Sequence, residues 1–135
     1  MIKTSVDVYK ARGLLDDYVK SISVEIEQKS GFKTMPRGGY LGNEFRATCE
    51  RPSGTALTSS PVFVLEVTDR QTEVSVRYGA VRRGELHPAD WRVECFVWTP
   101  DWLGNLSALL TRATPTIIAD VLTVLETAGE IPSRK

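Results

Sequence analysis

Apolar residues in the first thirty positions are spaced as in a long amphipathic helix. They recur at intervals of three and four, at Val8, Ala11, Leu15, Tyr18, Ile22 and Ile26. This spacing places them on one face of a helix, which we predict over residues 6–29. Residues 21–28 also alternate between apolar and polar side chains, as in a strand, so a break near Ser21 is the alternative.

Four segments in the middle of the chain carry the apolar patterns of strands. They cover residues 44–50, 61–68, 72–78 and 91–98. The second segment is almost continuously apolar, which is typical of a central strand covered on both faces. No helix pattern separates consecutive segments, and the short link Asp69-Arg70-Gln71 suits a hairpin. We therefore predict an antiparallel meander.

The last third of the chain carries the apolar pattern of helices. Residues 100–113 present leucines on one side, and a second apolar stripe runs from Thr114 to Gly129. Thr99-Pro100 and Thr114-Pro115 each combine an N-cap residue with a proline suited to the first helical position. These signals predict two helices with a break at Pro115.

Together these elements predict one globular domain of the α+β class over residues 1–135. It would contain an N-terminal helix, a four-stranded antiparallel meander and two C-terminal helices, with the helices packed on one face of the sheet. A length of 135 residues is usual for a single domain with one core.

Composition and charge narrow the classes of function. The chain has 17 basic and 17 acidic residues, a balance that argues against nonspecific nucleic-acid binding and permits a homodimer. The sequence contains neither an apolar run of 18 residues nor a secretory signal, so we expect no membrane span and a cytoplasmic location. Cys49 and Cys95 are too few for a disulfide scaffold and are expected to be reduced.

A glycine-rich segment precedes the predicted strands. Residues 33–42 include several glycines and a proline, which predicts a flexible connection. Within it, Arg37, Gly38, Gly39 and Tyr40 form a candidate ligand loop in which Arg37 would contact an anion. The segment follows a helix and precedes a strand, the reverse of the order in a phosphate-binding loop. A connection without a ligand is the simpler interpretation.

Few residues are suited to catalysis or metal binding. His87 is the single histidine, and it is either a general base oriented by Asp90 or an exposed loop residue. This histidine and the two cysteines lack the spacing of zinc ligands. Asp16 and Asp17, adjacent on a helix, would point about 100° apart rather than toward one ion. We expect no catalytic residue, no metal and no cofactor.

Aromatic residues around the last predicted strand define the best candidate surface. Trp91 and Trp98 are separated by an odd number of positions, so in a regular strand they face opposite sides of the sheet. At least one would lie away from the helices, where tryptophan commonly anchors a protein partner. The predicted partner-binding set is Trp91, Phe96, Trp98, Arg82 and Arg83.

These observations favour a small non-enzymatic protein that binds another protein, or itself, through a sheet face with exposed aromatic residues. A bacterial adaptor, chaperone or inhibitor, including an immunity-like protein, fits this description. One alternative is a small-molecule-binding protein or hydrolase with a cleft between sheet and helices, lined by His87, Arg37 or paired carboxylates. A nucleic-acid-binding domain is the other.

Overall fold

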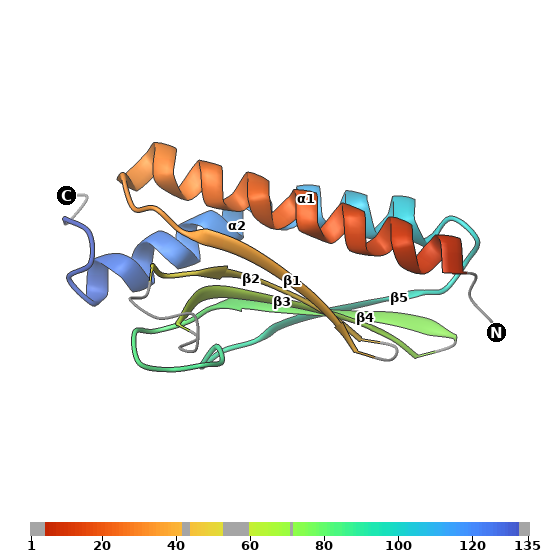
Figure 1. The fold of residues 1–135 in the computed structure, drawn as a ribbon. Helices are drawn as coiled ribbons and strands as arrows, with labels where there is room; N and C mark the ends of the chain where they lie inside the picture. Colours follow the sequence, from red (N-terminus) through yellow and green to blue (C-terminus); the bar gives the residue numbers. More distant parts are fainter. Residues whose placement is uncertain (1–4, 42–43, 53–59, 71, 133–135) are drawn as a thin grey trace.

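The computed structural model describes residues 5–41, 44–52, 60–70 and 72–132, without the side chains of residues 5–8, 40 and 41. It confirms the α+β class and the antiparallel sheet (Figure 1). The elements are α1 (Ser5–Ser30), β1 (Met35–Leu41), β2 (Glu44–Glu50), β3 (Pro61–Asp69), β4 (Glu73–Ala80), β5 (Arg92–Val97) and α2 (Trp102–Thr127). The strands lie side by side in chain order, each antiparallel to its neighbours.

The predicted N-terminal helix is confirmed as α1, and residues 21–28 belong to it without a break. Its buried side chains keep the helical spacing, at Ala11, Leu15, Val19, Ile22 and Ile26. Val24, which the strand interpretation would bury with its neighbours, is 54% exposed. Gly31 ends the helix with φ 75°, and its N–H donates to the carbonyl of Glu27 at 2.7 Å.

In the described part of the chain the sheet has five strands rather than four, because part of the predicted flexible connection 33–42 forms β1. β1 pairs with β2 from Met35 opposite Glu50 to Leu41 opposite Glu44. Gly38 leaves room beside β1 for the carboxylate of Asp16 on α1, since a Cβ there would force that carboxylate to move. Pairing with β2 therefore overrides the weak strand propensity of proline and glycine.

The C-terminal region is one helix rather than the predicted two, because α2 continues through Pro115. Proline in a helix interior removes a hydrogen bond and costs about 3 kcal/mol. The buried positions nevertheless keep their spacing across it: Leu106, Leu109, Leu110, Ala113, Ile117, Ile118, Val121, Leu122 and Leu125. The proline itself is exposed. Burial of one continuous apolar stripe outweighs the missing hydrogen bond.

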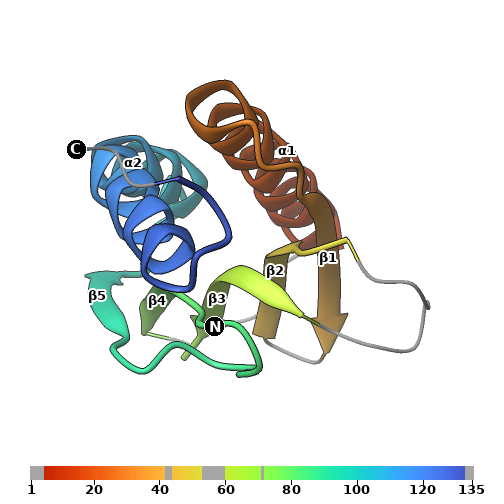
Figure 2. The same ribbon diagram turned by 90° about the vertical axis from the view of Figure 1, so that its left-hand side faces the viewer.

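Both helices lie on one face of the sheet, α1 over β1 and β2, and α2 mainly over β3 and β4 (Figure 2). The core lies between this face and the helices. Tyr18 joins the two helices, since its hydroxyl lies 2.8 Å from Thr114 Oγ1 and donates to the carbonyl of Leu110 at 3.1 Å. Among the described helices, α2 alone is long and apolar enough to cross a membrane by length and composition.

A buried ion pair holds the end of α2 against the sheet. Arg51 follows β2 and donates to both carboxylate oxygens of Glu130 at 2.8 Å, and each side chain is only 6% exposed. The same guanidinium donates to the carbonyls of Pro61 and Val81, at the start of β3 and the end of β4. Arg51 therefore connects three strands with the chain that follows α2.

We predict that Arg51→Met destabilises the protein by about 3–5 kcal/mol, because it leaves the Glu130 carboxylate buried without its partner. The matched control is Arg92→Met. Arg92 pairs with Asp120 at 2.8 Å in an ion pair whose side chains are 50% and 36% exposed, so its loss costs about 1 kcal/mol or less. Urea unfolding followed by circular dichroism measures both, and equal losses would contradict the prediction.

Candidate binding surface

The helix-free face of the sheet, termed the open face below, carries a row of ion-paired side chains. Arg46 on β2, Glu66 on β3 and Arg77 on β4 lie directly opposite one another. Arg77 Nε donates to Glu66 at 2.6 Å, and Arg46 Nε lies 3.4 Å from the same carboxylate. Glu66 is only 6% exposed, whereas Arg46 and Arg77 are 39% and 47% exposed. The row therefore presents two guanidinium groups and one largely covered carboxylate.

The connection between β4 and β5, residues 81–91, covers one end of the open face (Figure 1). Pro88 packs onto Gly79 so closely that a Cβ at position 79 would lie 2.6 Å from Pro88 Cβ. Trp91 then stacks on Arg77, whose guanidinium carbon lies 4.2 Å from the ring centroid. The His87 ring lies 6.5 Å from that of Trp91. Trp91 therefore adds an aromatic ring at the Arg77 end of the row, next to β5.

The open-face side of β5 is apolar and exposed. Val93 and Val97 are 58% and 71% exposed, and Cys95 between them is also exposed. We call these three residues the β5 strip. On an ordinary half-buried strand the apolar side faces the core and the polar side faces solvent. β5 has the opposite arrangement along most of its length.

The helix-facing side of β5 is charged at one end and apolar at the other. Arg92 pairs with Asp120 on α2, and Glu94 lies 3.4 Å from Arg112 on the same helix. The hydroxyl of Tyr78 on β4 donates to Glu94 at 3.1 Å. Phe96 and Trp98 pack against the core. Side-chain ion pairs thus connect β5 to α2, which lies mainly over β3 and β4.

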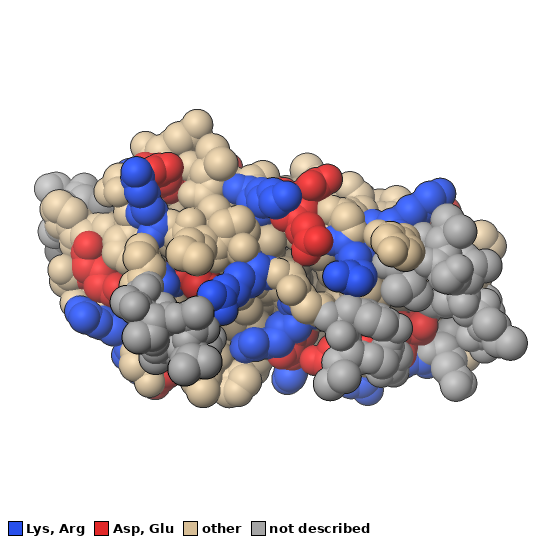
Figure 3. Space-filling model, in the orientation of Figure 1, with Lys and Arg blue, Asp and Glu red and all other residues tan. Residues whose placement is uncertain are grey.

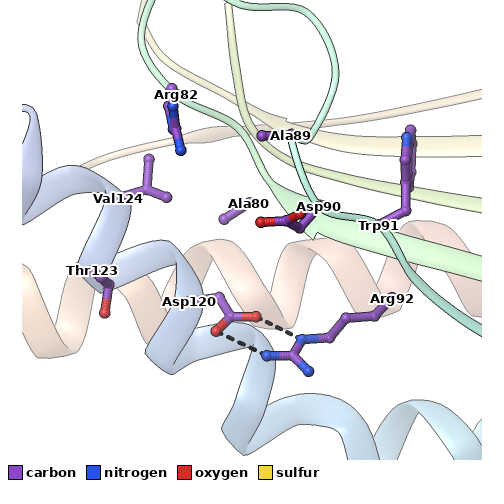
Figure 4. A pocket seen from close by; sticks show the side chains of 9 residues that line it. All are labelled: Ala80, Arg82, Ala89, Asp90, Trp91, Arg92, Asp120, Thr123 and Val124. Carbon is purple, nitrogen blue, oxygen red and sulfur yellow. Dashed lines mark hydrogen bonds and ion pairs between the residues drawn. The ribbon is translucent and has the colours of Figure 1, made fainter.

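A groove of about 400 Å³ lies between α2 and the start of β5 (Figure 4). Its charged lining residues are Arg82, Asp90, Arg92 and Asp120, and Arg92 and Asp120 form the ion pair described above. The groove therefore offers one guanidinium and one carboxylate outside that pair. On the face shown in Figure 3, acidic and basic side chains are interspersed.

The structure separates the five residues predicted to bind a partner. Trp91 lies on the open face beside Arg77, whereas Phe96 and Trp98 lie on the helix-facing side and pack against the core. This agrees with the expectation that Trp91 and Trp98 face opposite sides of the sheet. Arg82 and Arg83 are exposed in the connection between β4 and β5, and Arg82 lines the groove.

The predicted ligand loop is part of β1, with two of its residues on a small cavity. Arg37 and Gly38 line about 200 Å³ together with Asp16 and Lys20. Gly39 is exposed within the strand, and the side chain of Tyr40 lies outside the described part of the chain. Arg37 is exposed, so this residue remains accessible to an anion.

The remaining candidates for chemistry do not form a site in the described residues. His87 is an exposed residue of the connection between β4 and β5. No group of three potential metal ligands is found among the described residues. Both cysteines are free, and burial raises the pKa of the Cys49 thiol to about 11. Cys95 is thus the accessible thiol of the pair.

The β5 strip is not among the surfaces predicted from the sequence. Charged and apolar residues alternate in Arg92-Val93-Glu94-Cys95, which shows that Val93 and Cys95 share one side of the strand. The alternation alone predicts that Val93 and Cys95 face the core, the reverse of what the structure shows.

Comparison of the chain with protein-family models, curated proteins and solved structures finds no match.

We predict that Gly79→Ala displaces residues 88–90 from the open face and destabilises the protein by about 1–3 kcal/mol. The added Cβ would lie 2.6 and 2.8 Å from two atoms of Pro88 and 3.0 Å from the Asp90 carbonyl. In the control Gly39→Ala, the nearest atom is the Arg46 carbonyl oxygen at 3.8 Å, an ordinary contact. Urea unfolding and the amide NMR shifts of residues 89–91 test this, and no difference between the variants would refute it.

Proposed function

We propose that this chain is a non-enzymatic protein-binding domain that contacts its partner through the open face. The observation that carries the proposal is the reversed polarity of β5, whose apolar side chains Val93 and Val97 face away from the helices. Exposed apolar side chains grouped on one surface are typical of sites where another molecule covers them. An adaptor, a chaperone or an inhibitor acting in the cytoplasm would have such a surface.

The composition of the open face also supports binding of a protein. Interfaces combine an apolar centre with polar groups and are enriched in tryptophan and arginine. Here the β5 strip adjoins Trp91 and Arg77, and Arg46 continues the row across the sheet. Met35, which is 48% exposed, adds an apolar side chain on β1. The ion pairs with Glu66 hold the arginines in fixed positions, which reduces the entropy lost on binding.

Site-specific photo-cross-linking in the native host tests this proposal. A photoreactive residue in place of Met35 or Val97 should cross-link the same partner, a protein other than this chain, whereas one in place of Val24 should not. Val24 is the matched control because it is an exposed valine on the outer side of α1, 54% accessible. Met35→Asp and Val97→Asp should each reduce recovery of that protein at least tenfold, as expected for an apolar contact in an interface.

The same cross-linking experiment can contradict the proposal. If cross-linking at positions 24, 35 and 97 yields the same proteins in the same amounts, the open face has no special role. The far-ultraviolet circular dichroism of each aspartate variant should match that of the parent protein, which separates lost binding from lost folding.

The groove between α2 and β5 favours a second candidate function, the binding of a small zwitterionic molecule. Arg82 and Asp90 would bind its opposite charges, and Val124 would contact its apolar part. A thermal-shift screen of amino acids and short peptides should then show a saturable rise in melting temperature. The rise should disappear in Arg82→Ala and persist in Arg83→Ala, since Arg83 is not among the lining residues. No rise with any of these ligands would remove this candidate.

A further inference from the structure

The backbone of β5 has hydrogen-bonding groups that point away from the sheet. The N–H of Trp98 donates to the carbonyl of Thr72 at 2.9 Å, which continues the register that places Glu73 opposite Val97. In an antiparallel pair, successive residues direct their backbone groups alternately toward and away from the partner strand. Residues 92, 94 and 96 therefore face β4, and Val93, Cys95 and Val97 direct their N–H and C=O groups outward.

Within the described residues, this edge lacks most of the features that prevent further pairing. β5 is the last strand in the sheet order, and Figure 2 shows no described element beyond it. Proteins commonly protect an edge strand with proline, charged side chains, a bulge or a covering segment. The opposite edge, β1, contains Pro36, whereas β5 contains neither proline nor lysine and pairs with β4 without a bulge. Its two charged residues, Arg92 and Glu94, are paired with α2. Among the described residues, nothing covers its outer backbone groups.

We propose that β5 pairs with β5 of a second copy of this chain, so that two five-stranded sheets form one continuous sheet. A two-fold axis perpendicular to the sheet makes the two strands antiparallel and leaves the helices of both copies on the same side. The outward residues of one copy must lie opposite outward residues of the other, because only then do donors meet acceptors.

The requirement that all three outward residues pair within the strand selects one register. With the axis at Cys95, Val93 lies opposite Val97 of the second copy, and Cys95 lies opposite Cys95 of the second copy. All three outward residues of each β5 then form hydrogen-bonded pairs. An axis at any other residue of β5 would place at least one of them opposite a residue beyond the strand, which begins at Arg92 and ends at Val97.

The side chains are compatible with this register. On the open face the two β5 strips meet, so that valine faces valine across the seam. On the helix-facing side, Glu94 lies opposite Phe96 of the second copy, and no like charges are directly opposed. The zero formal net charge removes long-range repulsion between two copies. This inference depends on the backbone edge and goes beyond the proposed function, which depends on open-face side chains.

Oxidative cross-linking and hydrodynamic measurements test the dimer. Opposed residues in a hydrogen-bonded pair have Cα atoms about 5.5 Å apart, within the range that a disulfide spans. Mild oxidation should therefore link two copies through Cys95, while the buried Cys49 stays unmodified. Cys95→Val should abolish the cross-link but leave a dimer in analytical ultracentrifugation, because the backbone groups remain.

Cys95→Pro tests the contribution of the backbone edge to the dimer separately from that of the side chains. Proline removes the central outward N–H without removing a bond to β4, so the dimer should dissociate at least tenfold more readily. Val93→Lys, a charge on the same edge, is the second variant in case the proline impairs folding. Met35→Asp, on the other edge strand, should leave the dimer intact, so failure of the proposed function and failure of the dimer can be distinguished.

Three results would overturn the dimer. The protein could sediment as a monomer at every concentration tested. A dimer could form that neither cross-links at Cys95 nor weakens in Cys95→Pro and Val93→Lys. The isolated protein could be monomeric while a different protein is lost on Cys95→Pro, which would show that the edge accepts a foreign strand.

Discussion

The placement of both helices on one face of a five-stranded sheet is the constraint on which the rest of the molecule depends. Strands lie about 4.8 Å apart and packed helices about 8–10 Å apart, so two helices cover roughly the width of such a sheet once. The opposite face must be polar, be covered by other chain or remain exposed. The Arg46–Glu66–Arg77 row makes part of this face polar, and the connection between β4 and β5 covers the part around Gly79. The β5 strip remains exposed.

The same constraint explains why α2 is continuous. Two shorter helices joined at Pro115 would each need their own orientation over the sheet, and the turn between them would expose backbone groups next to the core. A single helix keeps the apolar stripe against the sheet and α1 on both sides of the proline. The ion pair of Arg51 with Glu130 then holds the chain just past its last turn. The end of the helix and three strand ends are thereby stabilised by one guanidinium group.

Sequence patterns predicted the elements whose apolar spacing is regular, namely α1, the four strands β2 to β5 and the region of α2. They failed where contacts distant in sequence decide the outcome. β1 is a strand because β2 pairs with it, although Pro36, Gly38 and Gly39 disfavour that structure. Pro115 is tolerated because a stripe on both sides of it is buried. Trp91 and Trp98 were correctly expected on opposite faces, because that follows from strand periodicity alone.

The orientation of β5 could not be predicted locally, because both of its sides contain apolar residues. Ion pairs with α2 and the burial of Phe96 and Trp98 hold one side toward the helices, and the β5 strip then faces outward as a consequence. In one copy the strip comprises only three side chains, whereas a stable interface typically buries about 800 Å² on each partner. Two copies joined along this edge would place both strips side by side in one larger apolar patch. Association through the backbone would therefore enlarge the apolar surface that a partner protein could contact.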